Sequence, residues 1–104
     1  MNPLAKLVSI YINEADEWGR KPLHLELLRL LHKEGLGGGT VVRAVAGFTG
    51  RGGVQTSSLV DAGGKLPLVV QFVESPENVE RVLPRIREMA PHRLITVQDV
   101  EVVP

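Results

Sequence analysis

The stretch LPLVVQFVE, which runs from Leu66 to Glu74, decides the fold because it is apolar on both faces of an extended chain. Successive side chains of a strand point to opposite faces of the sheet. The two faces carry Leu68, Val70 and Phe72 on one side, and Val69, Gln71 and Val73 on the other. Strands that are nearly continuous in apolar residues have both faces covered in the folded protein. Residues 66–74 therefore predict a sheet strand with something packed on each side.

The residues that follow this strand predict a helix. Ser75 can cap the first free N–H groups, Pro76 is tolerated in the first turn, and Glu77 is favoured near the positive end of the helix dipole. Apolar residues then recur at helical spacing until Pro91, where we expect the helix to end.

The rest of the chain adds one helix and three strands. In addition to the strand at 66–74, strands are predicted over 4–12, 40–48 and 94–103. The first helix is predicted between Pro22 and Gly35. Residues 13–21 form a predicted polar loop. In the last strand the apolar alternation changes phase between Val97 and Val100, so we expect a bulge near Gln98-Asp99 or a break into two short strands.

The element order β-α-β-β-α-β is the split βαβ arrangement. It is an α+β fold, a ferredoxin-like βαββαβ sandwich whose four-stranded antiparallel sheet carries two helices on one face. The chain has 104 residues, enough for one domain, and we assign 1–104 to it. Two helices cover only one face, yet the strands at 4–12 and 66–74 are apolar on both. We therefore predict a homo-oligomer built sheet to sheet.

Composition limits the classes of function. The formal net charge is zero, so no general attraction to nucleic acid or anionic membrane is expected. The absence of cysteine excludes a disulfide framework and thiolate chemistry. The longest apolar stretches are far below the roughly 20 residues of a membrane span, and residues 1–6 lack the pattern of a signal peptide. We expect a cytoplasmic protein.

The segment GFTGRGG, residues 47–53, leaves a predicted strand and enters a long loop. Glycines let backbone N–H groups turn toward an anion, and Arg51 could add a bidentate phosphate contact. The segment lacks the Gly-Lys-Ser/Thr ending of a Walker motif and the following helix of a Rossmann fingerprint. Loops as long as 47–65 are uncommon in small domains and are usually functional or disordered. A flexible connection and a ligand-responsive loop both remain open.

The polar loop before the first helix contains carboxylates and cations. Glu14 and Asp16 could perform acid–base work. Solvated side chains with local ion pairs explain the same residues, because no nucleophile accompanies them. Arg20 or Lys21 could bind a ligand instead.

The histidines and a second glycine run are weaker candidates for a metal or ligand site. His24 and His32 lie about 12 Å apart along one predicted helix and cannot share a metal ion. We therefore predict no metal site. Glycines between 35 and 39 suit a helix end and a tight turn, although Thr40 could face a ligand from the start of its strand.

The glycine residues and the element order together resemble the PII signalling proteins. Gly38-Gly39-Thr40-Val41, followed by Gly47-Phe48-Thr49-Gly50-Arg51, is similar to the Gly-x-Thr-Val and Gly-Phe-Gly-Arg block of that family. Those proteins are trimeric βαββαβ sensors that bind adenine nucleotides in clefts between subunits. Their long loop after the second strand reports the ligand to partner proteins.

The chain resembles one PII-like branch almost from end to end, the family called domain of unknown function 190. The matching residues are Tyr11-Ile12-x-Glu14-x-Asp16-x-Trp18, Lys21-Pro22-Leu23, Gly35-x-x-Gly38-x-Thr40-Val41-x-Arg43, Gly47-Phe48, Leu66-Pro67 and Asp99-Val100-Glu101-Val102. No single motif is decisive, but their order and spacing make the resemblance specific.

The resemblance implies a trimer with a nucleotide-binding cleft. By position, Thr40 would lie near a base, and Gly47, Phe48 and Arg51 at the root of the signalling loop. The predicted ligand-binding residues are Thr40, Arg43, Gly47, Phe48, Gly50, Arg51 and Lys65, with Lys21 in reserve. The loop 49–65 would contact a protein target or a membrane transporter. No cofactor other than an adenine nucleotide ligand is expected.

Departures from the PII pattern limit the class of nucleotide that the site can bind. Residues 40–47 are one residue longer than in the signalling proteins, which allows a bulge in the strand, and Thr49 replaces their second glycine. The glycine–lysine loop that holds phosphates before the last strand is absent, because residues 91–93 form only a short link. A monophosphate or a cyclic nucleotide would need fewer phosphate contacts from this site than a triphosphate.

We therefore predict a regulatory protein that binds a small anionic ligand, first of all an adenine nucleotide, and signals through the loop 49–65. One alternative is a trimeric interaction module without nucleotide, resembling the CutA proteins. The other is an enzyme that uses Glu14 or Asp16.

Overall fold

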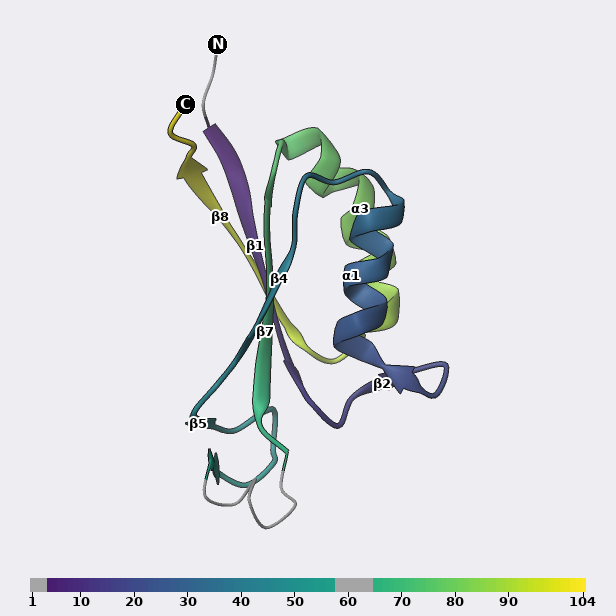
Figure 1. The fold of residues 1–104 in the computed structure, drawn as a ribbon, viewed down its shortest axis with the longest axis vertical. Coiled ribbons are helices and arrows are strands. Elements are labelled where there is room, and N and C mark those ends of the chain that lie inside the picture. The colour runs from purple at the N-terminus through teal and green to yellow at the C-terminus, as the bar shows by residue number, and fades with distance from the viewer. Residues whose placement is uncertain (1–3, 58–64) are drawn as a thin grey trace.

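The computed structural model describes residues 4–57 and 65–104. Its elements are β1 (Leu4–Asn13), β2 (Glu17–Trp18), β3 (Lys21–Pro22), α1 (Leu23–Lys33), β4 (Thr40–Arg43), β5 (Ala46–Gly47), β6 (Gln55–Thr56), β7 (Pro67–Glu74), α3 (Pro76–Met89) and β8 (Leu94–Glu101). One antiparallel sheet has the strand order β4-β7-β1-β8, and both helices lie on the same side of it (Figure 1). The predicted ferredoxin-like α+β fold is confirmed.

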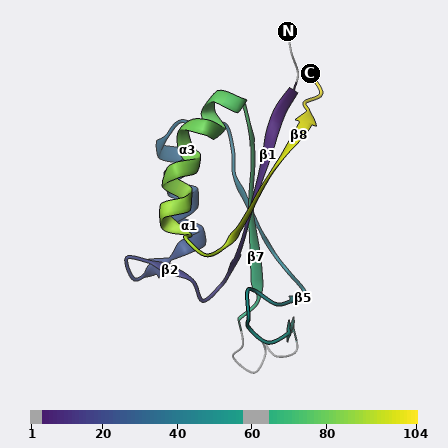
Figure 2. The ribbon, with the colours of Figure 1, turned by 180° about the vertical axis from the view of Figure 1, so that it is seen from behind.

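The register of the sheet separates two faces. Val8 of β1 lies opposite Phe72 of β7 and Val97 of β8, and this set faces the helices. Tyr11 belongs to the other set, together with its partner Leu94. The view from behind shows that, among residues 4–57 and 65–104, no helix lies on that second face (Figure 2). We call it the open face.

The ends of the helices carry the capping and terminating residues that the sequence predicts. The Ser75 hydroxyl accepts a hydrogen bond from the Asn78 N–H at 3.2 Å and so caps α3. Pro22 directly precedes α1, and Gly35 follows it with φ +80°, a conformation that glycine adopts without steric cost.

The core lies between the helices and the sheet. Its largest fully buried side chains are Val8, Ile10, Ile12, Leu27, Val70, Val82 and Ile86. The open face, in contrast, carries large apolar side chains in contact with solvent. Tyr11, Val42, Val73 and Leu94 are between 40% and 61% exposed. The central strands are therefore apolar on both faces, as their sequences predict.

The predicted bulge or break in the last strand is wrong. β8 pairs with β1 in one continuous register from Leu94 to Glu101. Val97 lies on the helix side opposite Val8, whereas Val100 lies on the open face opposite Ala5. The apolar alternation changes phase because β8 contributes apolar side chains first to one face and then to the other.

The single strand predicted over 40–48 is also wrong. β4 ends at Arg43, and the last link to β7 runs from the Ala44 N–H to the Pro67 carbonyl at 3.0 Å. β7 begins at Pro67, which has no N–H to continue the ladder. The chain then forms β5, which pairs with β6 instead of β7.

The predicted polar loop 13–21 also contains extra structure. β1 extends to Asn13, and β2 pairs with β3 in a short hairpin. Gly19 and Arg20 form its turn with φ of 61° and 67°. Two consecutive residues with positive φ are typical of the tight turns that join hairpin strands.

Candidate functional site

A cleft of about 280 Å³ lies at the end of the open face where β7 begins and the chain enters β8. The residues lining it are Tyr11, Ile12, Phe48, Thr49, Gly50, Pro67, Leu68, Val69, His92, Arg93 and Leu94. They come from four segments that are far apart in the sequence. β5, directly before Phe48, lies at the end of the sheet opposite the C-terminus (Figure 1).

Two aromatic side chains line this cleft, which we call the loop-root cleft because Phe48 and Gly50 lie where the predicted loop begins. Phe48 follows β5 and is 64% exposed, and Tyr11 of β1 is 40% exposed. Large apolar rings are normally buried, so an exposed pair at one cleft indicates a surface that can be covered by a ligand or another chain. Aromatic faces of this kind can stack on a planar base.

The turn after Phe48 is held by hydrogen bonds. The Gly52 N–H donates to the Thr49 carbonyl at 3.0 Å, and Gly50 has φ +59°. The Asn13 amide donates to the Thr49 hydroxyl at 3.4 Å and to the Gln55 side-chain oxygen at 3.2 Å. The end of β1 therefore fixes the described start of the loop.

Arg93 brings positive charge to the cleft. Its guanidinium donates to both carboxylate oxygens of Asp16, from Nε at 2.8 Å and from Nη2 at 2.5 Å. A Cβ placed on Gly50 would lie 3.4 Å from Arg93 Nη1, so the guanidinium lies against the glycine turn. His92 lines the same cleft and is exposed.

The structure brings together only some of the predicted ligand-binding residues. Phe48 and Gly50 line the cleft. Gly47 precedes them in β5, where a Cβ would lie 3.3 Å from Pro67 Cγ, a tight contact that favours glycine. Arg51 is exposed and follows the turn, outside the lining.

Arg43 and Lys65 belong to a second cluster, around Glu14. The Glu14 carboxylate accepts a hydrogen bond from the Leu66 N–H at 2.8 Å and forms an ion pair with Arg43 at 3.1 Å. The Leu66 hydrogen bond and, more weakly, the charges of Arg43 and Lys65 hold the pKa of Glu14 below its usual value. Arg43 therefore points to Glu14, not into the cleft.

The remaining predicted positions lie elsewhere. Thr40 starts β4 opposite Gln71, and Lys21 lies in the β2–β3 hairpin. Of the predicted signalling loop 49–65, residues 58–64 lie outside the described part of the chain.

Sequence reasoning missed Tyr11 and Arg93 as cleft residues. A signal was present in the predicted topology, because the end of the first strand and the start of the last lie side by side in this fold. Tyr11 pairs with Leu94, the residue directly after Arg93. Nothing in the local sequence, however, indicates that Arg93 joins Asp16.

Metal-binding clusters and membrane-spanning helices are both absent from the described residues. No group of three or more His, Cys, Asp or Glu side chains in residues 4–57 and 65–104 could hold a metal ion. Within the same residues, neither helix is both long and apolar enough to cross a membrane.

Comparison with a solved structure supports the fold. CPII from Thiomonas intermedia K12, solved bound to ADP and bicarbonate, superposes with a TM-score of 0.67 at 20% sequence identity. The match covers 95% of this chain and 88% of CPII. The two proteins therefore share the same fold.

Comparison of sequences identifies the family. A UPF0166 protein of Methanocaldococcus jannaschii is 30% identical over 99 residues, which cover 94% of this chain and 91% of the relative. A UPF0166 protein of Aquifex aeolicus is 34% identical over 98 residues, covering 94% and 92%. The model of the DUF190 family, described as Uncharacterized ACR, matches residues 5–102. The chain therefore belongs to the DUF190 family.

Proposed function

We propose that this protein is a regulatory homo-oligomer that binds an adenine nucleotide or a similar small anion in the loop-root cleft. One observation carries the proposal: the cleft combines two exposed aromatic rings, a glycine turn and an arginine. The rings suit a base. Asp16 engages Nε and Nη2 of the Arg93 guanidinium, so its Nη1, which lies against Gly50, and nearby backbone N–H groups are the donors for a phosphate.

The size of the cleft favours a ligand shared between subunits. About 280 Å³ is just below the range of small-molecule sites, which is roughly 300–1,000 Å³. The cleft opens on the face that carries Tyr11, Val42, Val73 and Leu94. A second copy covering that face would enlarge and close the site. A trimer, as in the PII proteins, is the arrangement that we propose.

The nucleotide is the first ligand to test because a protein of the same fold, CPII, is bound to ADP. The short link from Pro91 to Arg93 leaves little backbone to hold a triphosphate. We therefore propose stronger binding of AMP or ADP than of ATP. Arg51, exposed beside the turn, is a second candidate for the phosphate.

The signalling part of the proposal uses the described start of the loop 49–65. Asn13 bonds both Thr49 and Gln55, so a ligand that moves the cleft wall also acts on this loop. The partner would be a protein that reads the loop. We propose binding and not catalysis, because Glu14 and Asp16 are each held in an ion pair with an arginine.

Differential scanning fluorimetry with AMP, cyclic AMP, ADP and ATP tests the ligand. Binding to one site in the folded state stabilises by RT ln(1 + [L]/Kd), about 2.7 kcal/mol at a hundred times Kd. Adenosine is the control without phosphate, and the guanine nucleotides are the control for the base. Unchanged melting temperatures with every nucleotide at millimolar concentration would refute the nucleotide proposal.

A further inference from the structure

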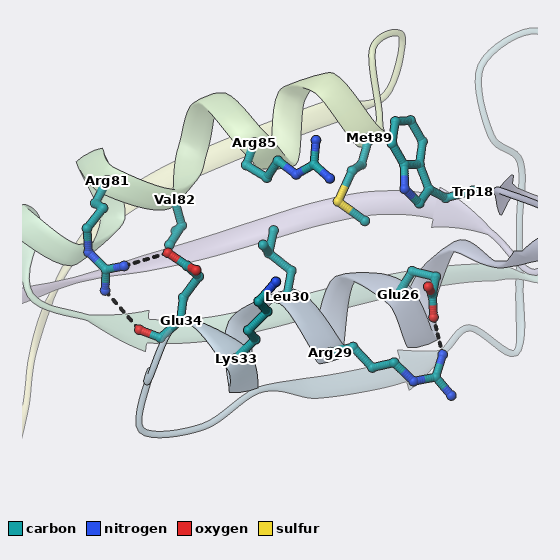
Figure 3. A pocket seen from close by; sticks show the side chains of 10 residues that line it. All are labelled: Trp18, Glu26, Arg29, Leu30, Lys33, Glu34, Arg81, Val82, Arg85 and Met89. Atoms are coloured by element: carbon teal, nitrogen blue, oxygen red, sulfur yellow. Dashed lines mark hydrogen bonds and ion pairs between the residues drawn. The ribbon is translucent and has the colours of Figure 1, made fainter.

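A groove of about 430 Å³ runs between α1 and α3, on the outer surface of the helix layer (Figure 3). It differs from the loop-root cleft in both place and chemistry. Its lining consists of Trp18, Glu26, Arg29, Leu30, Lys33, Glu34, Arg81, Val82, Arg85 and Met89. We call it the helix groove.

The floor of the helix groove is apolar. Leu30 and Met89 extend into it from opposite helices (Figure 3), and Val82 of α3, which is buried in the core, also lines it. Trp18 closes one end, and Arg81 closes the other by donating to the Glu34 carboxylate at 2.7 Å and to its carbonyl at 3.0 Å. The groove therefore has a defined length.

The walls of the helix groove are positively charged. Four cations line it against two carboxylates, although the net charge of the whole chain is zero. Among the described residues, Lys33 has no ion-pair partner. Arg29 and Arg85 are 63% and 49% exposed, and within the described part of the chain their ion pairs are only with carboxylates three residues away on their own helices. Arg85 also lies over the Trp18 ring, 5.7 Å from its centroid. Exposed pairs of this kind are weak, so these cations can exchange their partners.

We propose that the helix groove binds an acidic amphipathic helix of a partner protein. The lining runs from Glu26 to Glu34, just after the end of α1, and from Arg81 to Met89 on α3. Each run spans eight residue steps, about 12 Å at 1.5 Å per residue, which is about two turns of a bound helix. Leucine-type side chains of the partner enter the floor beside Leu30 and Met89, and its carboxylates meet Lys33 and Arg85. This is the helix-in-groove mode of recognition.

The inference is independent of the proposed nucleotide site. Both helices lie on the side of the sheet away from the open face, so an oligomer built sheet to sheet leaves the helix groove accessible (Figure 2). The outcome of a test of partner binding at the helix groove is therefore independent of whether the loop-root cleft binds a nucleotide.

The test uses the full chain and a fluorescein-labelled 14-residue peptide of leucines and glutamates, with the leucines at positions i, i+3, i+4 and i+7. Anisotropy gives the affinity. Trp18, the only tryptophan of the chain, reports occupation of the groove with an unlabelled peptide. We expect saturable binding with a change in Trp18 emission. The K33E/R85E double variant should bind about tenfold or more weakly, because each removed attraction becomes a repulsion.

Matched controls separate the groove from general charge. R51E changes the charge at the other proposed site and should leave peptide affinity unchanged. A peptide with glutamine for glutamate, and one with serine for leucine, should each bind at least about tenfold more weakly. Peptide binding that survives in K33E/R85E, or that survives the loss of the leucines, overturns the proposal, as does no binding at all. Full competition by millimolar citrate also overturns it, because the site would then recognise small carboxylates.

Discussion

Arg93 and Asp16 form a two-point ion pair between segments that are 77 positions apart in the sequence. The pair joins the link before β8 to the chain that leaves β1. Both side chains are partly shielded from water, with 27% and 19% exposed. The same guanidinium lies against Gly50 in the loop-root cleft. One contact therefore joins two distant segments and positions the Arg93 guanidinium at the candidate site.

We predict that Asp16→Asn lowers the free energy of unfolding by about 1 kcal/mol, since it removes a charge-assisted, partly shielded pair. Urea unfolding followed by circular dichroism measures the change. Glu17→Gln is the matched control, because Glu17 is an exposed carboxylate in the adjacent hairpin. The control should stay within about 0.5 kcal/mol of the wild type. Equal stability of the two variants would show that the Arg93 pair is energetically neutral.

We predict an acid-sensitive contribution from Glu74. Its carboxylate accepts hydrogen bonds from the Asn78 side chain and from the Gly37 and Ser75 N–H groups, and these hold its pKa below the usual value of 4.5. Since the folded state binds this proton less tightly than the unfolded state, ionised Glu74 stabilises the fold above the usual pKa. That contribution is lost as the pH falls through the lowered pKa.

Chemical unfolding from about pH 6 down to about pH 3 tests the Glu74 contribution. The free energy of unfolding should fall more steeply for the wild type than for Glu74→Gln, which has no charge to lose. Glu80→Gln, on the exposed side of α3, should follow the wild-type curve. Parallel curves for the wild type and Glu74→Gln would contradict the assignment.

The sequence predicts the elements whose signals are local. Ser75 and Pro76 mark the start of α3, and the alternation from Leu68 onward marks β7, because caps and side-chain periodicity act within a few residues. The break after Arg43 depends instead on where the partner strand begins, at Pro67. Pairing across the sheet sets that limit, so no pattern within 40–48 contains it.

The same distinction holds for the candidate site. Phe48 and Gly50 stand in one glycine-rich segment and could be chosen from it. Arg93 reaches the cleft only because α3 returns the chain to the end of β1, where Asp16 fixes the guanidinium. Arg43, which looked equally suitable as a phosphate ligand, is held by Glu14. Long-range ion pairs therefore determine that Arg93 lies at the cleft and that Arg43 points away from it.

We predict that Val73→Glu dissociates the homo-oligomer. Val73 is 45% exposed on the open face, and a buried, unpaired carboxylate at an interface is strongly unfavourable. Sedimentation velocity at micromolar concentration should show an oligomer for the wild type and a monomer for the variant. Leu25→Glu removes an apolar side chain of similar exposure, 39%, from the helix layer and should remain oligomeric. A monomeric wild type would contradict the sheet-to-sheet assembly.

We predict that Phe48→Ala weakens binding of AMP or ADP by about tenfold, because stacking of a base on an aromatic ring contributes about 1–3 kcal/mol. The ring is 64% exposed without ligand, so its loss should change the melting temperature of the free protein little. Isothermal titration calorimetry measures the affinity, and scanning fluorimetry the stability. Val45→Ala is the control, since Val45 is 80% exposed and does not line the cleft. If both variants bind like the wild type, Phe48 does not contact the base and the ligand lies elsewhere.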